Sequence, residues 1–136
     1  MFLPVNNLIN VVSIDFHFSR GQIFFIDNAL NEIQLLTLPN HNLSQLGLVE
    51  SFSIRPVVAT DMAQPNSLVV DWIADNLYWS DQERHLIEVA RLDGSSRKVL
   101  IDLDLDRPKC LQILPNLGFL FWINIGMFQR IERGKI

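Results

Sequence analysis

The sequence predicts an all-β fold assembled from repeated units of about four strands. Three observations support this prediction. Apolar residues rarely recur at helical spacing, short apolar or alternating runs are separated by turn residues, and one short pattern returns along the chain. The strands expected from these runs span residues 10–16, 22–26, 68–72, 76–79, 86–92, 97–101, 111–114 and 119–123.

The returning pattern is a pair of aromatic residues, a small or β-branched residue, and then Asp or Asn. Its three copies are Phe24-Phe25-Ile26-Asp27, Tyr78-Trp79-Ser80-Asp81 and Phe121-Trp122-Ile123-Asn124. The second and third copies start 43 residues apart, and each follows a proline by 13 residues. The first and second start 54 residues apart, and a loop inserted around residues 40–53 accounts for the difference. A period of about 40–45 residues with roughly four strands is typical of the blades of a β-propeller.

We therefore expect three blade repeats, at about residues 9–62, 65–107 and 108–136, with the third truncated inside its third strand. This amounts to a partial β-propeller of about two and a half four-stranded blades. A single blade cannot bury both of its faces, so neighbouring blades must cover it and the ring must close. The sequence thus predicts a piece of a propeller with two uncovered ends.

The composition excludes several classes of protein. With 49% hydrophobic and 19% charged residues, the 136-residue chain can bury a core and is not a disordered tail. A net charge of −4 argues against nucleic acid as a partner. The single cysteine, Cys110, excludes an internal disulfide, and we expect it to be a buried, inert thiol in an apolar strand. The first residues lack the positive charge of a signal peptide, and the apolar run 117–123 is far shorter than the roughly 20 residues of a membrane span.

The repeated residues are expected to build the fold rather than to catalyse a reaction. Neighbouring aromatic residues on a strand point to opposite faces, so we expect each pair to pack between blades instead of forming a ligand cage. Asp27, Asp71 and Asp81 recur with the blade, which favours a structural role in which each carboxylate accepts backbone N–H groups at a strand end. The sequence holds no nucleophile elbow and no phosphate-binding glycine motif. We therefore expect no catalytic residue.

The acidic residues near position 104 do not complete a calcium loop. Asp102, Asp104 and Asp106 alternate as the first ligands of such a loop do. However, Arg107 occupies the position that requires Gly, and Ile113 the position that requires Glu. We expect an exposed edge strand and turn here, with no metal and no cofactor.

Histidines and a glycosylation sequon are the remaining candidate sites. His17, His41 and His85 have no close pairing in the sequence, which argues against zinc, and we interpret them as solvated loop residues. The one Asn-x-Ser/Thr sequon, at Asn42, lies in the long inserted loop, where a glycan has room.

The second repeat resembles the YWTD repeat of the low-density lipoprotein receptor family. Residues 70–81 (VDWIADNLYWSD) and 87–100 (IEVARLDGSSRKVL) match such repeats nearly position for position. Residues 104–109 (DLDRPK) resemble the link between blades in that family. Residues 15–21 (DFHFSRG) resemble the first blade of propellers in its Wnt co-receptor branch.

Five positions depart from the family pattern. Phe25 replaces the family's Trp, Ile26 replaces its Thr, and Asn124 replaces the Asp of the motif. Leu114 occupies the position that matches Asp71, and Ile125 stands where many family blades carry another Trp. The motif departures affect the first and third repeats and leave the fold expectation intact.

The resemblance implies part of a six-bladed propeller in a non-enzymatic, endocytic or Wnt co-receptor. Such a receptor is anchored in the membrane, with the propeller at the extracellular face of the plasma membrane. The implied partners are protein ligands, namely lipoproteins, Wnt ligands or Wnt antagonists. Two alternatives remain open: an adhesive propeller of a nidogen-like matrix protein, and a propeller hydrolase such as a lactonase, which would need a metal-binding ring of carboxylates in its central channel.

The resemblance also implies where a ligand would bind. In this family the ligand face is formed by loops that follow the YWTD strand and by links between blades. Carried over by position, it points to Asn28 after Asp27, to Gln82 and Glu83 after Asp81, and to Lys109 after the proline of the link. All four are polar residues expected at loop positions held by a rigid sheet, where binding residues tend to gather. As an alternative, they are solvated loop residues without a binding role.

Overall fold

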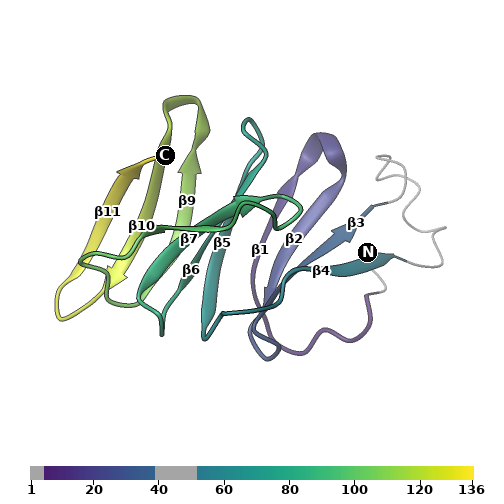
Figure 1. The fold of residues 1–136 in the computed structure, drawn as a ribbon, viewed down its shortest axis with the longest axis horizontal. Coiled ribbons are helices and arrows are strands. Elements are labelled where there is room, and N and C mark those ends of the chain that lie inside the picture. Colours follow the sequence, from purple (N-terminus) through teal and green to yellow (C-terminus); the bar gives the residue numbers. More distant parts are fainter. Residues whose placement is uncertain (1–4, 39–51) are drawn as a thin grey trace.

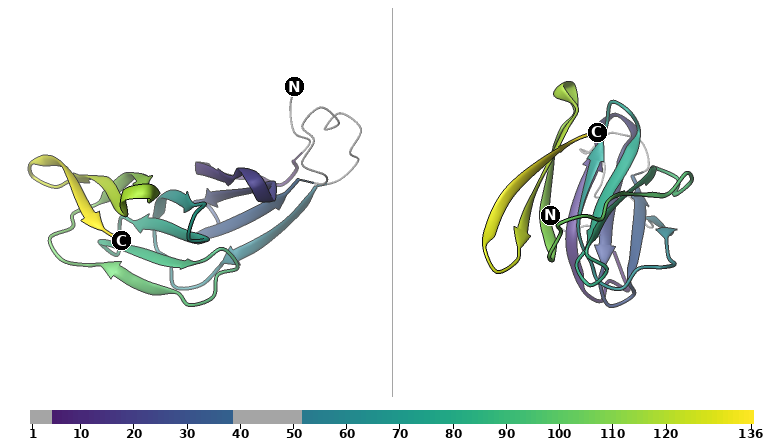
Figure 2. Two further views of the ribbon diagram at one scale, coloured as in Figure 1. Left: turned by 90° about the horizontal axis from the view of Figure 1, so that it is seen from above. Right: turned by 60° about the vertical axis from the view of Figure 1, so that its left-hand side comes forward.

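The computed structural model describes residues 5–38 and 52–136. They form three antiparallel sheets, which follow one another in sequence order across the molecule (Figure 1). Seen from above, the row of sheets curves rather than running straight (Figure 2). The prediction of an all-β propeller fragment is confirmed.

Each sheet is a meander in which every strand pairs with the next one along the chain. The first sheet consists of β1 (Val11–His17), β2 (Gln22–Asp27), β3 (Glu32–Thr37) and β4 (Ser53–Val58). The second consists of β5 (Pro65–Asp71), β6 (Asn76–Asp81), β7 (Leu86–Arg91) and β8 (Lys98–Ile101). The third has only β9 (Pro108–Leu114), β10 (Phe119–Ile125) and β11 (Gln129–Lys135).

Two strands, β3 and β4, are missing from the strands that the sequence predicts, and β11 was expected only as the third strand of a truncated repeat, without bounds. Only Ser53 of β4 falls within the loop expected around residues 40–53. β4 contains Pro56 and β11 contains Gly134, and both residues weaken a strand pattern when it is examined alone. Pairing with β3 and with β10, respectively, overrides these local preferences.

The connection between the first two strands of a sheet differs among the sheets. Single-turn 3₁₀ helices, η1 (Phe18–Arg20) and η3 (Pro115–Leu117), join β1 to β2 and β9 to β10. Each ends at a glycine with positive φ, Gly21 at 59° and Gly118 at 66°, a conformation that other residues adopt at a cost. In the second sheet Asp71 shapes the turn instead, because its Oδ1 accepts the N–H groups of Ile73 (2.9 Å) and Ala74 (3.0 Å).

Apolar side chains fill the space between neighbouring sheets. The first cluster joins the first two sheets, and the second cluster joins the second and third. Trp79 is fully buried in the first cluster, and Trp122 is 5% exposed in the second. Tyr78 points from the opposite face of β6 into the second cluster, where burial raises the pKa of its hydroxyl above the ordinary value. The two members of this aromatic pair therefore serve different junctions.

Hydrogen bonds also connect the innermost strands of adjacent sheets. The N–H group of Leu68 in β5 donates to Ser13 Oγ of β1 at 3.0 Å, and that of Val70 donates to Asp15 Oδ2 at 2.8 Å. At the next junction the N–H group of Leu111 donates to Ser67 Oγ at 2.8 Å. Backbone donors on the inner edge of one sheet are thus satisfied by side chains of the sheet before it.

Two expectations for single residues were wrong. His17 is buried, at 4% exposure, because its ring lies between the sheets with Nε2 3.0 Å from Asp75 Oδ1. Cys110 is exposed rather than buried. Its φ of 54° coincides with a register shift between β9 and β10, and this irregularity interrupts the inward–outward alternation on which the expectation relied. His85 is exposed, whereas His41 lies outside the described residues.

Replacing Trp79 by Ala is expected to lower the free energy of unfolding by about 3–5 kcal/mol, because a large side chain leaves a cavity between two sheets. Trp72 is a matched control, since it lies in the β5–β6 turn and is 52% exposed. Trp72→Ala should change the denaturation midpoint far less. Equal midpoints for the two variants would show that the interface between sheets does not depend on Trp79.

Candidate functional site

The Asp or Asn of each motif lies at, or one residue before, the end of the second strand of its sheet. We call this end of the sheets the motif end. Asp27 is fully buried there, and its carboxylate accepts backbone N–H groups from Ile9 (2.9 Å) and Asn10 (3.1 Å). It also accepts the N–H group of Ala29 in the turn that follows β2 (3.1 Å). One carboxylate thus holds both the incoming chain and its own hairpin turn.

Asp81 repeats this arrangement in the second sheet. It is also fully buried, and it accepts N–H groups from Ala63 (2.8 Å) and Gln64 (3.1 Å) in the link that precedes β5. Its third bond comes from the N–H group of Arg84 in the β6–β7 turn (3.1 Å). A carboxylate can accept this many bonds because both oxygens are acceptors and the charge strengthens each bond.

Asn124 takes the same place in the third sheet with different chemistry. Its Oδ1 accepts the N–H group of Asp106 at 2.7 Å, and its Nδ2 donates to the carbonyl of Asp104 at 2.8 Å. The amide replaces an acceptor by a donor, and it binds a link carbonyl where a carboxylate would bind another N–H group. The link to the third blade therefore remains attached although the motif Asp is absent.

The four residues expected to contact a ligand all lie at the motif end, but they differ in availability. Asn28 is half-buried, and its Nδ2 donates to the carbonyl of Pro65 at 3.1 Å, so it joins the first sheet to the second. Gln82 is half-buried in the β6–β7 turn, and its N–H group donates to the carbonyl of Gln64. Glu83 is exposed in the same turn, and Lys109 is half-buried near the start of β9.

The sequon at Asn42 lies outside the described residues, so its glycosylation stays a prediction.

Two positions that depart from the family pattern lie in the third sheet. Leu114, which occupies the position that matches Asp71, is followed by the η3 turn, which ends at Gly118. Ile125 follows Asn124 and donates its N–H group to the carbonyl of Asp106 at 3.0 Å, as Gln82 does to Gln64.

Sequence analysis missed a buried ion pair beside the motif end. Glu88 is only 4% exposed, and Arg97 binds both of its carboxylate oxygens, with Nε at 3.0 Å and Nη2 at 2.8 Å. The guanidinium also lies over the Trp79 ring, 5.4 Å from its centroid, and donates to the carbonyls of Thr60 and Asp61. Arg97 therefore ties β7, the aromatic motif and the link together. No sequence motif identified Arg97, because its partners come close to it only when the chain folds.

A pocket of about 590 Å³ opens next to this ion pair. Arg84, Arg97 and Lys98 line it together with Asp61 and Glu88, so both signs of charge are present. Arg84 donates to the Asp61 carbonyl, and it lies 3.6 Å from Glu88. The arginines of the pocket are thus engaged in holding the link to the second sheet.

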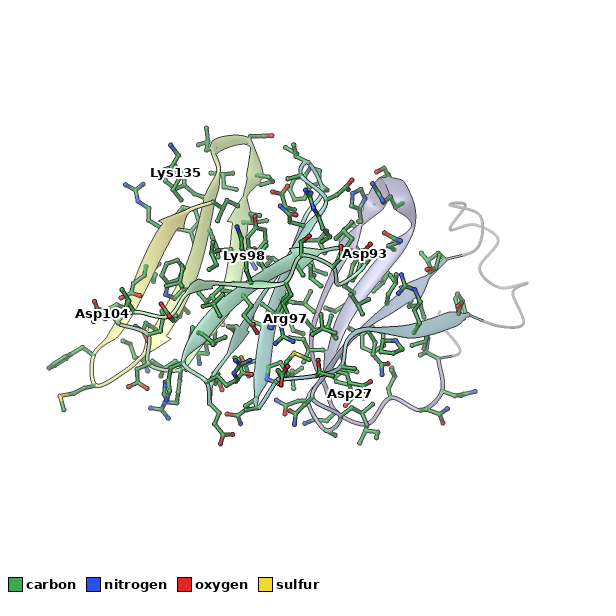
Figure 3. All side chains as sticks on the ribbon, in the orientation of Figure 1. Asp27, Asp93, Arg97, Lys98, Asp104 and Lys135 are labelled. Carbon is green, nitrogen blue, oxygen red and sulfur yellow. The ribbon has the colours of Figure 1, made fainter. Side chains whose placement is uncertain are left out.

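Figure 3 labels Asp27, at the motif end of the first sheet, near the lower edge of the molecule, and Lys135, at the opposite end of the third sheet, near the upper edge. Within the described residues, no group of three or more His, Cys, Asp or Glu side chains is arranged to hold a metal ion. The same part of the chain includes no helix that is long and apolar enough to cross a membrane.

Asp81→Ala is expected to lower the free energy of unfolding by about 2–4 kcal/mol, because three backbone N–H groups lose a buried, charged acceptor. Asp81→Asn should cost less, since Asn124 shows that an amide can hold a link at this position. Asp93→Ala is the control: Asp93 is exposed, and its carboxylate accepts the N–H group of nearby Ser95 at 2.9 Å. Chemical denaturation would measure all three. A loss for Asp81→Ala no larger than that for Asp93→Ala would contradict the clamp.

Comparisons with known proteins agree with this geometry. Residues 75–111 match the family described as low-density lipoprotein receptor repeat class B. The chain is 34% identical over 124 residues to mouse low-density lipoprotein receptor-related protein 5; the match covers 91% of this chain and 7% of that protein. The chain therefore spans only a small part of the relative's length.

Solved structures share the arrangement of the sheets. A chain of the nidogen/laminin complex superposes with a TM-score of 0.79 at 21% identity, over 92% of this chain and 44% of the other. A gluconolactonase from Xanthomonas campestris superposes with a TM-score of 0.68 at 13% identity, over 88% of this chain and 36% of the enzyme. These likenesses concern the fold alone. Together with the sequence matches, they place the chain among the proteins that carry low-density lipoprotein receptor class B (YWTD) repeats.

Proposed function

We propose that the chain forms part of an extracellular, ligand-binding propeller of a membrane-anchored lipoprotein-receptor-related protein, either an endocytic receptor or a Wnt co-receptor. The observation that carries the proposal is the 34% identity to a receptor-related protein over 91% of the chain. In this proposal the blade repeats are residues 9–62, 65–107 and 108–136, and the partners are proteins: lipoproteins, Wnt ligands or Wnt antagonists. The chain has no enzymatic role.

The motif end is the proposed ligand face. Its hairpin turns and links are held by the buried side chains of Asp27, Asp81 and Asn124, so residues on these loops keep fixed positions relative to one another. Fixed positions lower the entropic cost of binding a protein partner. Glu83 is the most accessible of the four candidate residues, and Lys109 supplies a positive charge at the neighbouring link. We assign Asn28 and Gln82 a supporting part, because their hydrogen bonds attach the turns to the adjacent links.

Adhesion in an extracellular matrix is the second candidate function. It is favoured by the superposition on a chain of the nidogen/laminin complex with a TM-score of 0.79. A propeller hydrolase is a remote alternative. It is disfavoured because Asp27 and Asp81, which a metal-dependent enzyme could use as ligands, already accept backbone N–H groups with both oxygens.

Reversing both charges at the proposed face, with Glu83→Lys and Lys109→Glu in the full-length protein, is expected to weaken ligand capture at the cell surface. Rim charges act mainly through the rate of association, so the loss should be larger at low ionic strength. A purified Wnt protein, a purified Wnt antagonist and lipoprotein particles would be tested separately, with surface expression measured in parallel.

The matched control reverses two exposed charges at the opposite end, Asp93→Lys and Lys135→Glu, both of which are labelled in Figure 3. This control should leave capture unchanged. Normal capture of all three probes by the Glu83/Lys109 variant, at normal surface expression, would exclude the motif end as the ligand face. Capture of laminin in place of the three probes would favour the matrix alternative.

A further inference from the structure

The turn between β10 and β11 carries two consecutive apolar side chains that lie mostly in solvent. Met127 is 92% exposed and Phe128 is 76% exposed. The turn belongs to the motif end, because it follows Asn124 near the end of β10 (Figure 1, yellow, lower left). Turn residues at this end are mostly polar in the second sheet, where the corresponding turn carries Glu83. A methionine at the tip of such a turn is therefore a distinct chemical feature of the third sheet.

Corresponding positions stay accessible in the two sheets that are followed by another sheet. Counted from the motif residue, Met127 corresponds to Arg84 of the second sheet and to Leu30 of the first. The Arg84 side chain is 35% exposed, and Leu30 is 41% exposed. The next position, Phe128 in the third sheet, is His85 in the second, whose side chain is 52% exposed. A following sheet thus leaves the tip of such a turn open to solvent, and the accessibility of Met127 does not require an uncovered end.

The base of the β10–β11 turn is attached to the preceding link. The N–H group of Ile125 donates to the carbonyl of Asp106 at 3.0 Å, and Arg107 Nη2 donates to the carbonyl of Ile125 at 3.2 Å. The backbone of Gly126 passes so close to the link that a Cβ atom there would lie 3.2 Å from an Asp106 carboxylate oxygen. The turn is therefore held at its base, while the side chain of Met127 extends into solvent.

Met62 provides an internal comparison. It is partly buried and packs against the apolar cluster between the first two sheets. Neighbouring side chains restrict the approach of a dissolved reagent to its sulfur. Of the two methionines in residues 5–38 and 52–136, Met127 is thus the one whose sulfur is open to a solution oxidant.

We propose that Met127 is a site at which peroxide modifies this chain and, resting on the proposed function, that the modification weakens ligand capture at the motif end. The thioether sulfur attacks one oxygen of hydrogen peroxide, so that an S–O bond forms while the O–O bond breaks. The sulfur loses two electrons, and the other oxygen leaves with both hydrogens as water. The product is methionine sulfoxide, which methionine sulfoxide reductases convert back to methionine.

The effect on binding follows from the change in polarity. Because Met127 and Phe128 are consecutive in a short turn, a protein ligand that covers one of them also covers the other. Methionine and phenylalanine are favoured in the buried parts of protein interfaces. A sulfoxide oxygen buried in the same contact requires a hydrogen-bond donor that the unmodified contact does not supply. Oxidation at this position therefore disfavours a contact that the unmodified side chain supports.

The first test follows the oxidation itself in the full-length protein with the Cys110→Ser substitution, which removes the exposed thiol. After peroxide treatment of the native protein, peptide mass spectrometry should show one added oxygen on Met127 at least about fivefold faster than on Met62. Unfolding the protein before treatment should bring the two rates together, because the difference comes from the fold. Equal rates in the native protein would overturn the proposal.

The second test measures ligand capture before peroxide treatment, after it, and after repair by methionine sulfoxide reductases. A purified Wnt protein, a purified Wnt antagonist and lipoprotein particles serve as separate probes. Oxidation should weaken capture of a bound probe about fivefold or more, and repair should restore it. Met127→Leu keeps an apolar side chain without sulfur, so this variant should capture normally and resist peroxide. Met62→Leu is the matched control and should remain as sensitive as the unmodified protein.

The outcomes separate this proposal from the proposed function. If the untreated protein captures none of the probes, the proposed function fails and the effect on capture fails with it, while mass spectrometry still decides the oxidation of Met127. If the untreated protein captures a probe and oxidised Met127 leaves capture unchanged, only the effect on capture is wrong. Equal peroxide sensitivity of Met127→Leu and the unmodified protein would likewise assign the loss to another residue and overturn the proposal.

Discussion

The rest of the structure depends on one constraint. At the motif end, the backbone of each link is hydrogen-bonded to a buried polar side chain. Asp81 holds the link before β5 and the β6–β7 turn with the same carboxylate, and Asp27 does the equivalent in the first sheet. Since the link determines where the innermost strand of a sheet begins, this bond fixes the sheet relative to its predecessor. The inter-sheet bonds from Leu68 and Leu111 then form along the inner edge.

Packing between the sheets follows from this placement. A meander buries one aromatic residue of its motif toward each neighbour, as Tyr78 and Trp79 do, so every blade depends on the blades on both sides. The hydrogen bonds of the two indole nitrogens differ, although the two sheets have the same arrangement of strands. Trp122 Nε1 donates to Glu132 at 2.9 Å, whereas the corresponding Glu88 is bound by Arg97. Trp79 Nε1 consequently has no hydrogen-bond partner among the described residues.

The arrangement of the sheets gives the molecule two kinds of surface, the loops at the motif end and the lateral faces of the sheets. The motif end presents hairpin turns and links whose backbone is hydrogen-bonded to the buried motif residues, and the proposed ligand face rests on this arrangement. The lateral faces are apolar and belong to the contact between blades. The loops of the motif end and the faces between blades are therefore formed by different residues.

The sequence by itself determined the all-β class, the period of the blades and the identity of the residues at the repeated positions, because strand alternation and turn chemistry are local properties. The family resemblance also pointed to Asn28, Gln82 and Glu83 in loops after the motif and to Lys109 in a link, and all four lie at one end of the sheets. The sequence did not delimit the less regular strands: the bounds of β4 and β11 follow from their pairing with β3 and β10.

Only the tertiary structure decided which side chains meet. His17 is buried because Asp75, 58 residues away, comes within 3.0 Å of its ring, and Arg97 is engaged because the link of another blade passes beside it. Cys110 is exposed because the register shifts at its position, which no alternation of residue types reveals. These contacts arise between blades, and their geometry depends on how one sheet is set against the next. The sequence periodicity specifies that the sheets repeat, whereas the packing determines which residues of one repeat face those of another.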